Sequence, residues 1–134
     1  MNHINPQDLS AAAVATRGAL DVSMLTGTWA NTNPSAQGIV RLVLTESGGN
    51  LAVRVFGAGT PEPFDWGEVP ACPFADGVAL TQSSSFTALY KLSFMSVWLQ
   101  TYVVKGVLVV VTFTQFRDDS GRSSYFGKEF FFRV

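Results

Sequence analysis

Leu25-Thr26-Gly27-Thr28-Trp29-Ala30-Asn31 is the stretch that decides the fold of this 134-residue chain. The glycine lets two backbones approach closely, and the bulky indole two residues later shares its face of an extended strand. Near the other end of the chain, Arg133 offers a guanidinium that can stack on that indole. We therefore expect Trp29 to close one end of a β-barrel and to serve the fold more than the chemistry.

The chain after residue 25 has the composition of short strands. Segments rich in Val, Phe, Thr and Tyr are broken by Gly, Asn, Asp, Ser and Pro, which predicts an all-β fold. Tight turn sequences predict antiparallel pairing in chain order, closing into an eight-stranded up-and-down barrel. The strands are expected at residues 26–32, 38–45, 51–57, 78–82, 85–94, 97–105, 107–116 and 124–133.

Two segments are expected to lie outside these strands. Residues 1–24 differ in composition and predict an N-terminal extension, with a possible helix near residues 6–17, while residues 25–134 form a single barrel domain. Residues 57–74 contain four prolines and are expected to form a long rigid loop.

Composition and charge exclude several classes of function. The nine basic and ten acidic residues give a net charge of −1 without a basic run, which argues against a nucleic-acid partner. The longest apolar run, 107–111, is too short for a membrane helix, so no membrane span is expected. The first residues lack the pattern of a secretion signal, and we expect a cytoplasmic protein.

The segment 25–31 resembles the first strand of the calycin superfamily, which includes lipocalins, fatty-acid-binding proteins and avidins. In these families the Gly-x-Trp strand opens an antiparallel barrel, the Trp fills its closed end and an Arg of the last strand packs on it. By resemblance these residues are Gly27, Trp29 and Arg133. The avidin-like version further implies that Asn31 and Ser35 contact the polar head of a ligand.

Side-chain alternation adds further candidates for ligand binding. Phe86 and Tyr90 share one face of their strand and are expected to point inward, where Tyr90 serves either as a catalytic phenol or as a core tyrosine. Trp98, Gln100 and Tyr102 alternate with an aliphatic set, and either set could line the lumen. With the aromatic set inside, these residues would orient a ligand. With it outside, they would form a subunit interface.

Trp66 is a further candidate for ligand binding, and charged residues near it offer a possible acid or base. Glu62 and Asp65 lie in the proline-rich segment, and a carboxylate held against the Trp66 indole would have a raised pKa. Solvated loop charges are the alternative. Arg41 and Arg54 are expected to face solvent, although an inward arginine could bind a ligand carboxylate.

The chain does not favour a metal centre or a cofactor. Cys72 is the single cysteine and is expected to be buried and unreactive, and His3 is the single histidine. Asp118 and Asp119 have the composition of a turn rather than of a calcium loop. A histidine-based catalytic triad and a metal site are therefore not expected.

Three functions remain compatible with the sequence. The first is binding of a small, largely apolar organic molecule in the barrel lumen. The second is a cofactor-free cyclase or isomerase that folds a polyketide or terpenoid substrate in the barrel, a use that resembles allene oxide cyclases. The third is an interaction module that forms a homodimer through exposed aromatic residues.

Overall fold

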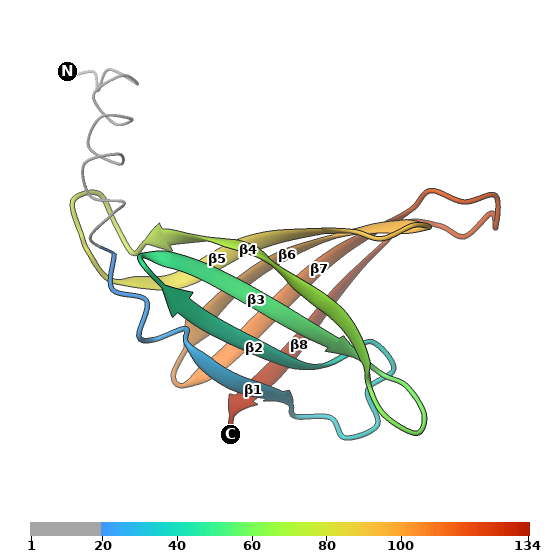
Figure 1. Ribbon diagram of the computed structural model, residues 1–134, viewed down its shortest axis with the longest axis horizontal. Helices are drawn as coiled ribbons and strands as arrows, with labels where there is room; N and C mark the ends of the chain where they lie inside the picture. Colours follow the sequence, from blue (N-terminus) through green and yellow to red (C-terminus); the bar gives the residue numbers. More distant parts are fainter. Residues whose placement is uncertain (1–19) are drawn as a thin grey trace, which may run out of the picture.

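The computed structural model describes residues 20–134, which form a closed barrel of eight antiparallel strands (Figure 1). Each strand pairs with the next in the chain, and β8 pairs with β1 to complete the closure. The predicted all-β up-and-down barrel is confirmed, whereas the possible N-terminal helix lies outside the described residues. The strands are β1 (Gly27–Asn31), β2 (Ile39–Ser47), β3 (Asn50–Gly57), β4 (Phe64–Ala75), β5 (Ser83–Lys91), β6 (Met95–Val104), β7 (Val107–Phe116) and β8 (Tyr125–Arg133).

The fourth strand lies where the sequence predicted a loop. β4 occupies most of the proline-rich segment 57–74, and residues 78–82 instead belong to its connection with β5. Pro70 is paired with β3 alone, and Pro73 is paired with β5 alone. Each proline therefore has one side without a partner strand, where its missing N–H costs no ladder hydrogen bond. The predictions of a loop at 57–74 and of a strand at 78–82 were both wrong. A strand that is paired on one side at each proline tolerates prolines that a strand paired on both sides would not.

Trp29 closes one end of the barrel, as predicted. Its side chain is 1% exposed, and its indole N–H donates to the Leu25 carbonyl at 2.9 Å. The Arg133 guanidinium lies 4.5 Å from the ring centroid and donates to the Met24 carbonyl at 2.7 Å. Gly27 has a φ of 127°, a backbone conformation that residues with a side chain rarely adopt, and the Arg133 Nε packs 3.5 Å from where a Cβ would lie.

Residues 20–25 also cover this closed end. Val22 and Leu25 are buried and join the barrel core, and Asp21 forms an isolated parallel bridge with Gln82. The Asp21 backbone N–H donates to Thr81 at 2.6 Å, and its carbonyl accepts from Ser83 at 2.9 Å. The entry to β1 is therefore bonded to the β4–β5 connection.

The core follows the two-residue alternation of the strands. Phe86, Ala88 and Tyr90 of β5 face inward, as predicted, and are 0%, 7% and 1% exposed. On β6 the aliphatic set faces the interior: Val97, Leu99 and Thr101 are buried, while Trp98, Gln100 and Tyr102 are exposed. This alternation settles the choice that the sequence left open between the two faces of β6.

Two β-bulges interrupt the alternation at the end of the barrel opposite Trp29. One extra residue of β2 lies between the pairs Ile39–Gly57 and Arg41–Phe56. One extra residue of β4 lies between the pairs that join Arg54 to Glu68 and Phe56 to Asp65, and Gly67 has a φ of 85° there. A bulge reverses the inward and outward positions beyond it. Both bulges therefore determine which side chains enter this open end.

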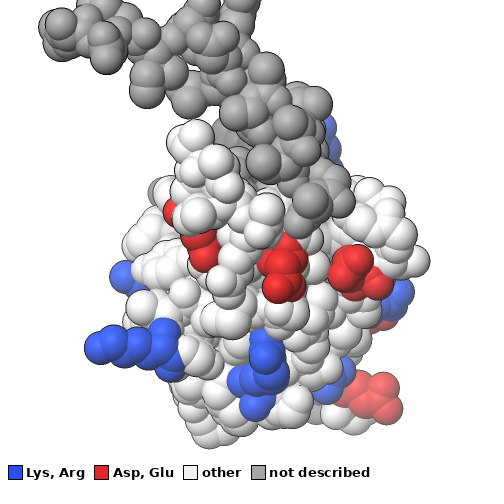
Figure 2. All heavy atoms as spheres, turned by 90° about the vertical axis from the view of Figure 1, so that its left-hand side faces the viewer, with Lys and Arg blue, Asp and Glu red and all other residues white. Residues whose placement is uncertain are grey.

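The described surface has no large patch of a single charge on the face that Figure 2 presents, where acidic and basic side chains lie scattered among uncharged ones. Within residues 20–134, no helix has the length and apolar character required to span a membrane.

Candidate functional site

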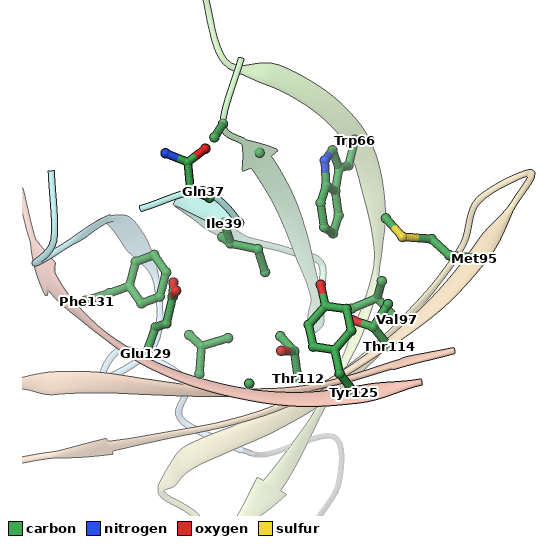
Figure 3. A pocket seen from close by; sticks show the side chains of 15 residues that line it. Gln37, Ile39, Trp66, Met95, Val97, Thr112, Thr114, Tyr125, Glu129 and Phe131 are labelled. Carbon is green, nitrogen blue, oxygen red and sulfur yellow. The ribbon is translucent and has the colours of Figure 1, made fainter. Parts of the chain in front are cut away.

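A cavity of about 360 Å³ opens at the end of the barrel opposite Trp29. Its wall combines apolar side chains with a small number of polar groups, and Figure 3 shows these surrounding one hollow. Such a composition is typical of small-molecule sites. The side chains that line it come from Gln37, Ile39, Ala58, Trp66, Met95, Val97, Val110, Thr112, Thr114, Tyr125, Glu129 and Phe131, with backbone from Gly38, Gly57 and Gly127.

Trp66, a candidate ligand-binding residue from the sequence, forms one wall of this cavity. Its indole lies so close to Gly57 that a Cβ at that position would be 2.7 Å from Trp66 Nε1. On its other side it meets the Tyr90 ring edge to face, with centroids 5.5 Å apart. Trp66 is therefore held between a strand backbone and a core aromatic residue.

Tyr90 supports this wall rather than lining the cavity. Its hydroxyl accepts from the Val55 backbone N–H at 3.1 Å, donates to the Gly67 carbonyl at 2.6 Å and lies 3.2 Å from the Val53 carbonyl. Burial raises the pKa of Tyr90 to about 12. The phenol thus satisfies backbone groups at the β4 bulge, which gives it a structural role in place of the free donor that a catalytic role requires.

The raised pKa of Tyr90 predicts a loss of stability at alkaline pH. Below pH 10, the ordinary tyrosine pKa, the phenol is neutral in both states and its full contribution is present. Between pH 10 and about 12 the unfolded chain loses this proton first, so the free energy of unfolding falls as pH rises. Urea denaturation across this range should show a steeper fall for the wild type than for Tyr90→Phe. Equal slopes would contradict the assignment.

Glu129 is the carboxylate of the cavity, and it was not among the residues predicted from the sequence. It is half-buried on β8, where it pairs with Val110 of β7. The Asn31 side-chain amide donates to Glu129 Oε2 at 2.5 Å. The signal was present in the sequence, because an inward Arg133 places every second residue before it, including Glu129, on the same face of the strand.

Asn31 holds the mouth of the cavity together. Besides Glu129, its amide donates to the Ile39 carbonyl at 2.9 Å, and its Oδ1 accepts from the Asn33 backbone N–H at 2.8 Å. These bonds tie together the two ends of the β1–β2 loop. Asn31 therefore positions the carboxylate, while its own polar atoms are already used by protein partners.

Three hydroxyl groups complete the polar part of the lining. Thr112 and Thr114 of β7 and Tyr125 of β8 lie on the same side as Glu129 in Figure 3, opposite Trp66 and Gln37. Gly127 allows the two strands to keep this arrangement, because a Cβ there would lie 2.7 Å from the Thr112 hydroxyl oxygen. These groups offer donors and acceptors to a ligand.

The carboxylates proposed from sequence as acids or bases lie elsewhere. Asp65 faces outward and forms an ion pair with Arg54 at 2.6 Å, and Glu62 is exposed in the β3–β4 loop. The Gly67 backbone N–H donates to Asp65 at 2.8 Å and, together with Arg54, lowers the pKa of this carboxyl. The pKa of Asp65 is thus lowered and not raised, in agreement with the alternative of solvated charges, because the β4 bulge turns this carboxyl away from the Trp66 indole.

Other predicted ligand contacts are also displaced from the cavity. Ser35 is exposed in the β1–β2 loop, and Phe86 is fully buried in the core outside the lining. Trp98, Gln100 and Tyr102 project from the outer surface of β6, so none of them lines the lumen.

Arg41 and Arg54 face outward, as expected. Arg41 lies 4.3 Å from the Phe56 ring centroid, and Arg54 pairs with Asp65. Cys72 is exposed on β4, which corrects the expectation of a buried thiol: Ala71 takes the inward position, so its neighbour points outward. Among the described residues, no cluster of three or more His, Cys, Asp or Glu side chains is placed to hold a metal ion.

The fold and the cavity together define a closed, antiparallel up-and-down β-barrel with a small polar and apolar cavity at one end, compatible with a calycin-like fold. Comparison of the chain with models of protein families, with curated proteins and with solved structures found no match.

Proposed function

We propose that this protein is a calycin-like carrier that binds a small, largely apolar organic molecule in its open-end cavity, within the cytoplasm. The observation that carries the proposal is the cavity of about 360 Å³ with an indole wall and few polar groups. This volume lies within the usual range for small-molecule sites, roughly 300–1,000 Å³. The stacking of Arg133 on Trp29, which resembles the closed end of calycins, supports the fold part of the proposal.

The proposal is tested by native mass spectrometry of protein purified without unfolding. We expect the wild type to retain a small molecule, or to bind an apolar fluorescent probe after delipidation. Thr112→Phe, which fills the cavity, should reduce binding at least about tenfold. Val111→Phe, which places the same side chain on the outer face of β7, is the matched control. Absence of any retained molecule and of any probe binding would contradict the proposal.

A second candidate function, a cofactor-free cyclase or isomerase, is favoured by two groups that line the same cavity. The Glu129 carboxylate and the Tyr125 phenol both belong to its wall, and such a pair can accept and donate a proton. An isomerisation, or a cyclisation that expels no group, conserves mass. If the barrel is an enzyme, the wild type and Glu129→Gln should therefore retain isomers of equal mass that separate by chromatography. An identical molecule in both proteins would favour the carrier.

The outer face of β6, β7 and β8 is an apolar surface suited to a second copy of the chain. Its cross-strand rows pair Trp98 with Phe113 and Phe113 with Phe126, and place Tyr102, Val109 and Phe130 side by side. The six exposed aromatic residues of this face are 40–59% exposed, and at about 200 Å² for each side chain they leave roughly 550 Å² of aromatic surface in water. The six are Trp98, Tyr102, Phe113, Phe126, Phe130 and Phe132.

The size of this aromatic face supports a homodimer. It approaches the roughly 800 Å² that each partner contributes to a stable interface, and it lies near the upper end of the roughly 300–600 Å² of the largest apolar patch on a typical monomer. Lys128 interrupts the rows beside Val111, but its aliphatic stem can lie along the surface while the ammonium group reaches the edge. We therefore propose that two copies associate through this face.

Phe113→Lys tests the dimer, because it places a charge on the central strand of the apolar face. We expect the wild type to sediment near twice the 14.5 kDa mass of the chain. The variant should dissociate to monomer at micromolar concentration, since burying an unpaired ammonium is costly. Phe64→Lys on β4, away from these strands, should leave the dimer intact. A wild type that sediments as a monomer up to about 100 µM would contradict the interface.

A further inference from the structure

The charge of the open-end cavity indicates what kind of ligand head group it accepts. Glu129 contributes a carboxylate to the lining, and within residues 20–134 that lining contains no Lys, Arg or His. The two ion pairs among the described residues, Arg54–Asp65 and Arg122–Asp118, do not involve Glu129. The cavity therefore presents a negative charge that no described protein cation balances.

The surroundings of Glu129 hold this carboxylate in place from one side. Asn31 donates to its Oε2 at 2.5 Å and is itself fixed by the Ile39 carbonyl and the Asn33 backbone N–H. An amide donor stabilises a carboxylate without neutralising it. Oε1 makes no hydrogen bond within the described part of the chain, and so it is available to a ligand.

None of the described arginines lines the cavity, and three of them are held at other places. Arg41 stacks on Phe56 and Arg54 pairs with Asp65, both on the outer surface, while Arg133 covers Trp29 at the closed end. A ligand carboxylate in the cavity would therefore meet Glu129 without a compensating cation. Two like charges in a partly dehydrated site repel each other, which disfavours fatty acids and other anionic ligands.

We propose that the ligand is an apolar molecule with a protonated amine, and that this amine pairs with Glu129. This inference rests on the proposed binding function of the cavity. The ammonium group would donate to the carboxylate and to the hydroxyl groups of Thr112 and Tyr125. The apolar body of the ligand would lie against Trp66 and Ile39 on the opposite wall. A charge-assisted hydrogen bond of this kind is stronger than a neutral one.

Three probes with the same ten-carbon chain test the head group: decylamine, decanol and decanoate. Isothermal titration calorimetry of the full chain measures their affinities at neutral pH, where the amine is protonated. We expect the wild type to bind decylamine at least about tenfold more tightly than decanol, and decanoate more weakly than either. Glu129→Gln keeps the shape of the side chain and should remove the preference for the amine while preserving decanol binding. Glu62→Gln, a change in an exposed carboxylate, is the matched control.

The outcomes separate this inference from the proposed function. Equal affinity of the wild type for decylamine and decanol, or tighter binding of decanoate, would overturn the assignment of the head group and leave a binding cavity in place. An amine preference that persists in Glu129→Gln would overturn the role of this carboxylate. Absence of binding by all three probes, together with no retained molecule, would overturn the binding function and the inference with it.

Discussion

Replacing Trp29 by alanine is expected to lower the free energy of unfolding by about 3–5 kcal/mol. The indole is 1% exposed and fills the closed end of the barrel, so its removal leaves a cavity that the surrounding strands cannot fill. The change also removes the surface on which Arg133 stacks and the donor to the Leu25 carbonyl. Guanidinium denaturation followed by circular dichroism measures the loss.

Trp98→Ala is the matched control for this change. Trp98 is the same residue type but is 42% exposed on the outer face of β6, so its truncation should cost about 1 kcal/mol or less in the monomer. Trp29→Phe should fall between the two variants, because it refills part of the space. A loss for Trp29→Ala no larger than that for Trp98→Ala would show that the closed end does not depend on the indole.

Tyr90→Phe should lower the free energy of unfolding by about 1–3 kcal/mol, although it removes a single oxygen atom. Without the hydroxyl, the Val55 N–H loses its acceptor and the Gly67 carbonyl loses its donor inside the barrel. Buried backbone groups without partners carry most of the expected cost. Urea denaturation near pH 7 measures the difference.

Tyr125→Phe provides the comparison for Tyr90→Phe. Tyr125 is 55% exposed, so water can replace any bond that its hydroxyl makes, and the expected change is below about 0.5 kcal/mol. Because Tyr125 lines the cavity, this variant should alter ligand affinity more than stability. Equal destabilisation by the two changes would contradict the structural role given to the Tyr90 hydroxyl.

The fold was predictable because its signals are local and repeated. Turn residues marked the ends of most strands, and Gly27-Thr28-Trp29 with Arg133 indicated the closed end correctly. The fourth strand was missed because its prolines suggest a loop. They fit a strand only when it is known which neighbouring strand each proline is paired with. Pairing is a property of neighbouring strands, and residues 64–75 could not reveal it alone.

The candidate site was predictable only in part. The two-residue alternation of side chains identified inward residues on the strand of Tyr90, but the last strand, which carries Glu129, was not read in this way. Trp66 was identified and does line the cavity, and Asn31 was identified and bonds to its carboxylate. Glu129 was missed, although counting back from Arg133 in steps of two reaches it. Trp98 was placed among the ligand contacts, because its own strand shows two faces that alternation alone cannot tell apart.

The amino-acid sequence by itself determined the all-β class, the chain-order pairing of the strands and the closure by Trp29, because these depend on local turn chemistry and on one bulky residue. Only the tertiary structure decided which side chains point into the open end of the barrel. The bulge at Gly67 reverses the alternation of β4, so that Trp66 faces the lumen and Asp65 faces Arg54. One extra residue in a ladder changes the face of every side chain beyond it, and its position follows from how neighbouring strands meet.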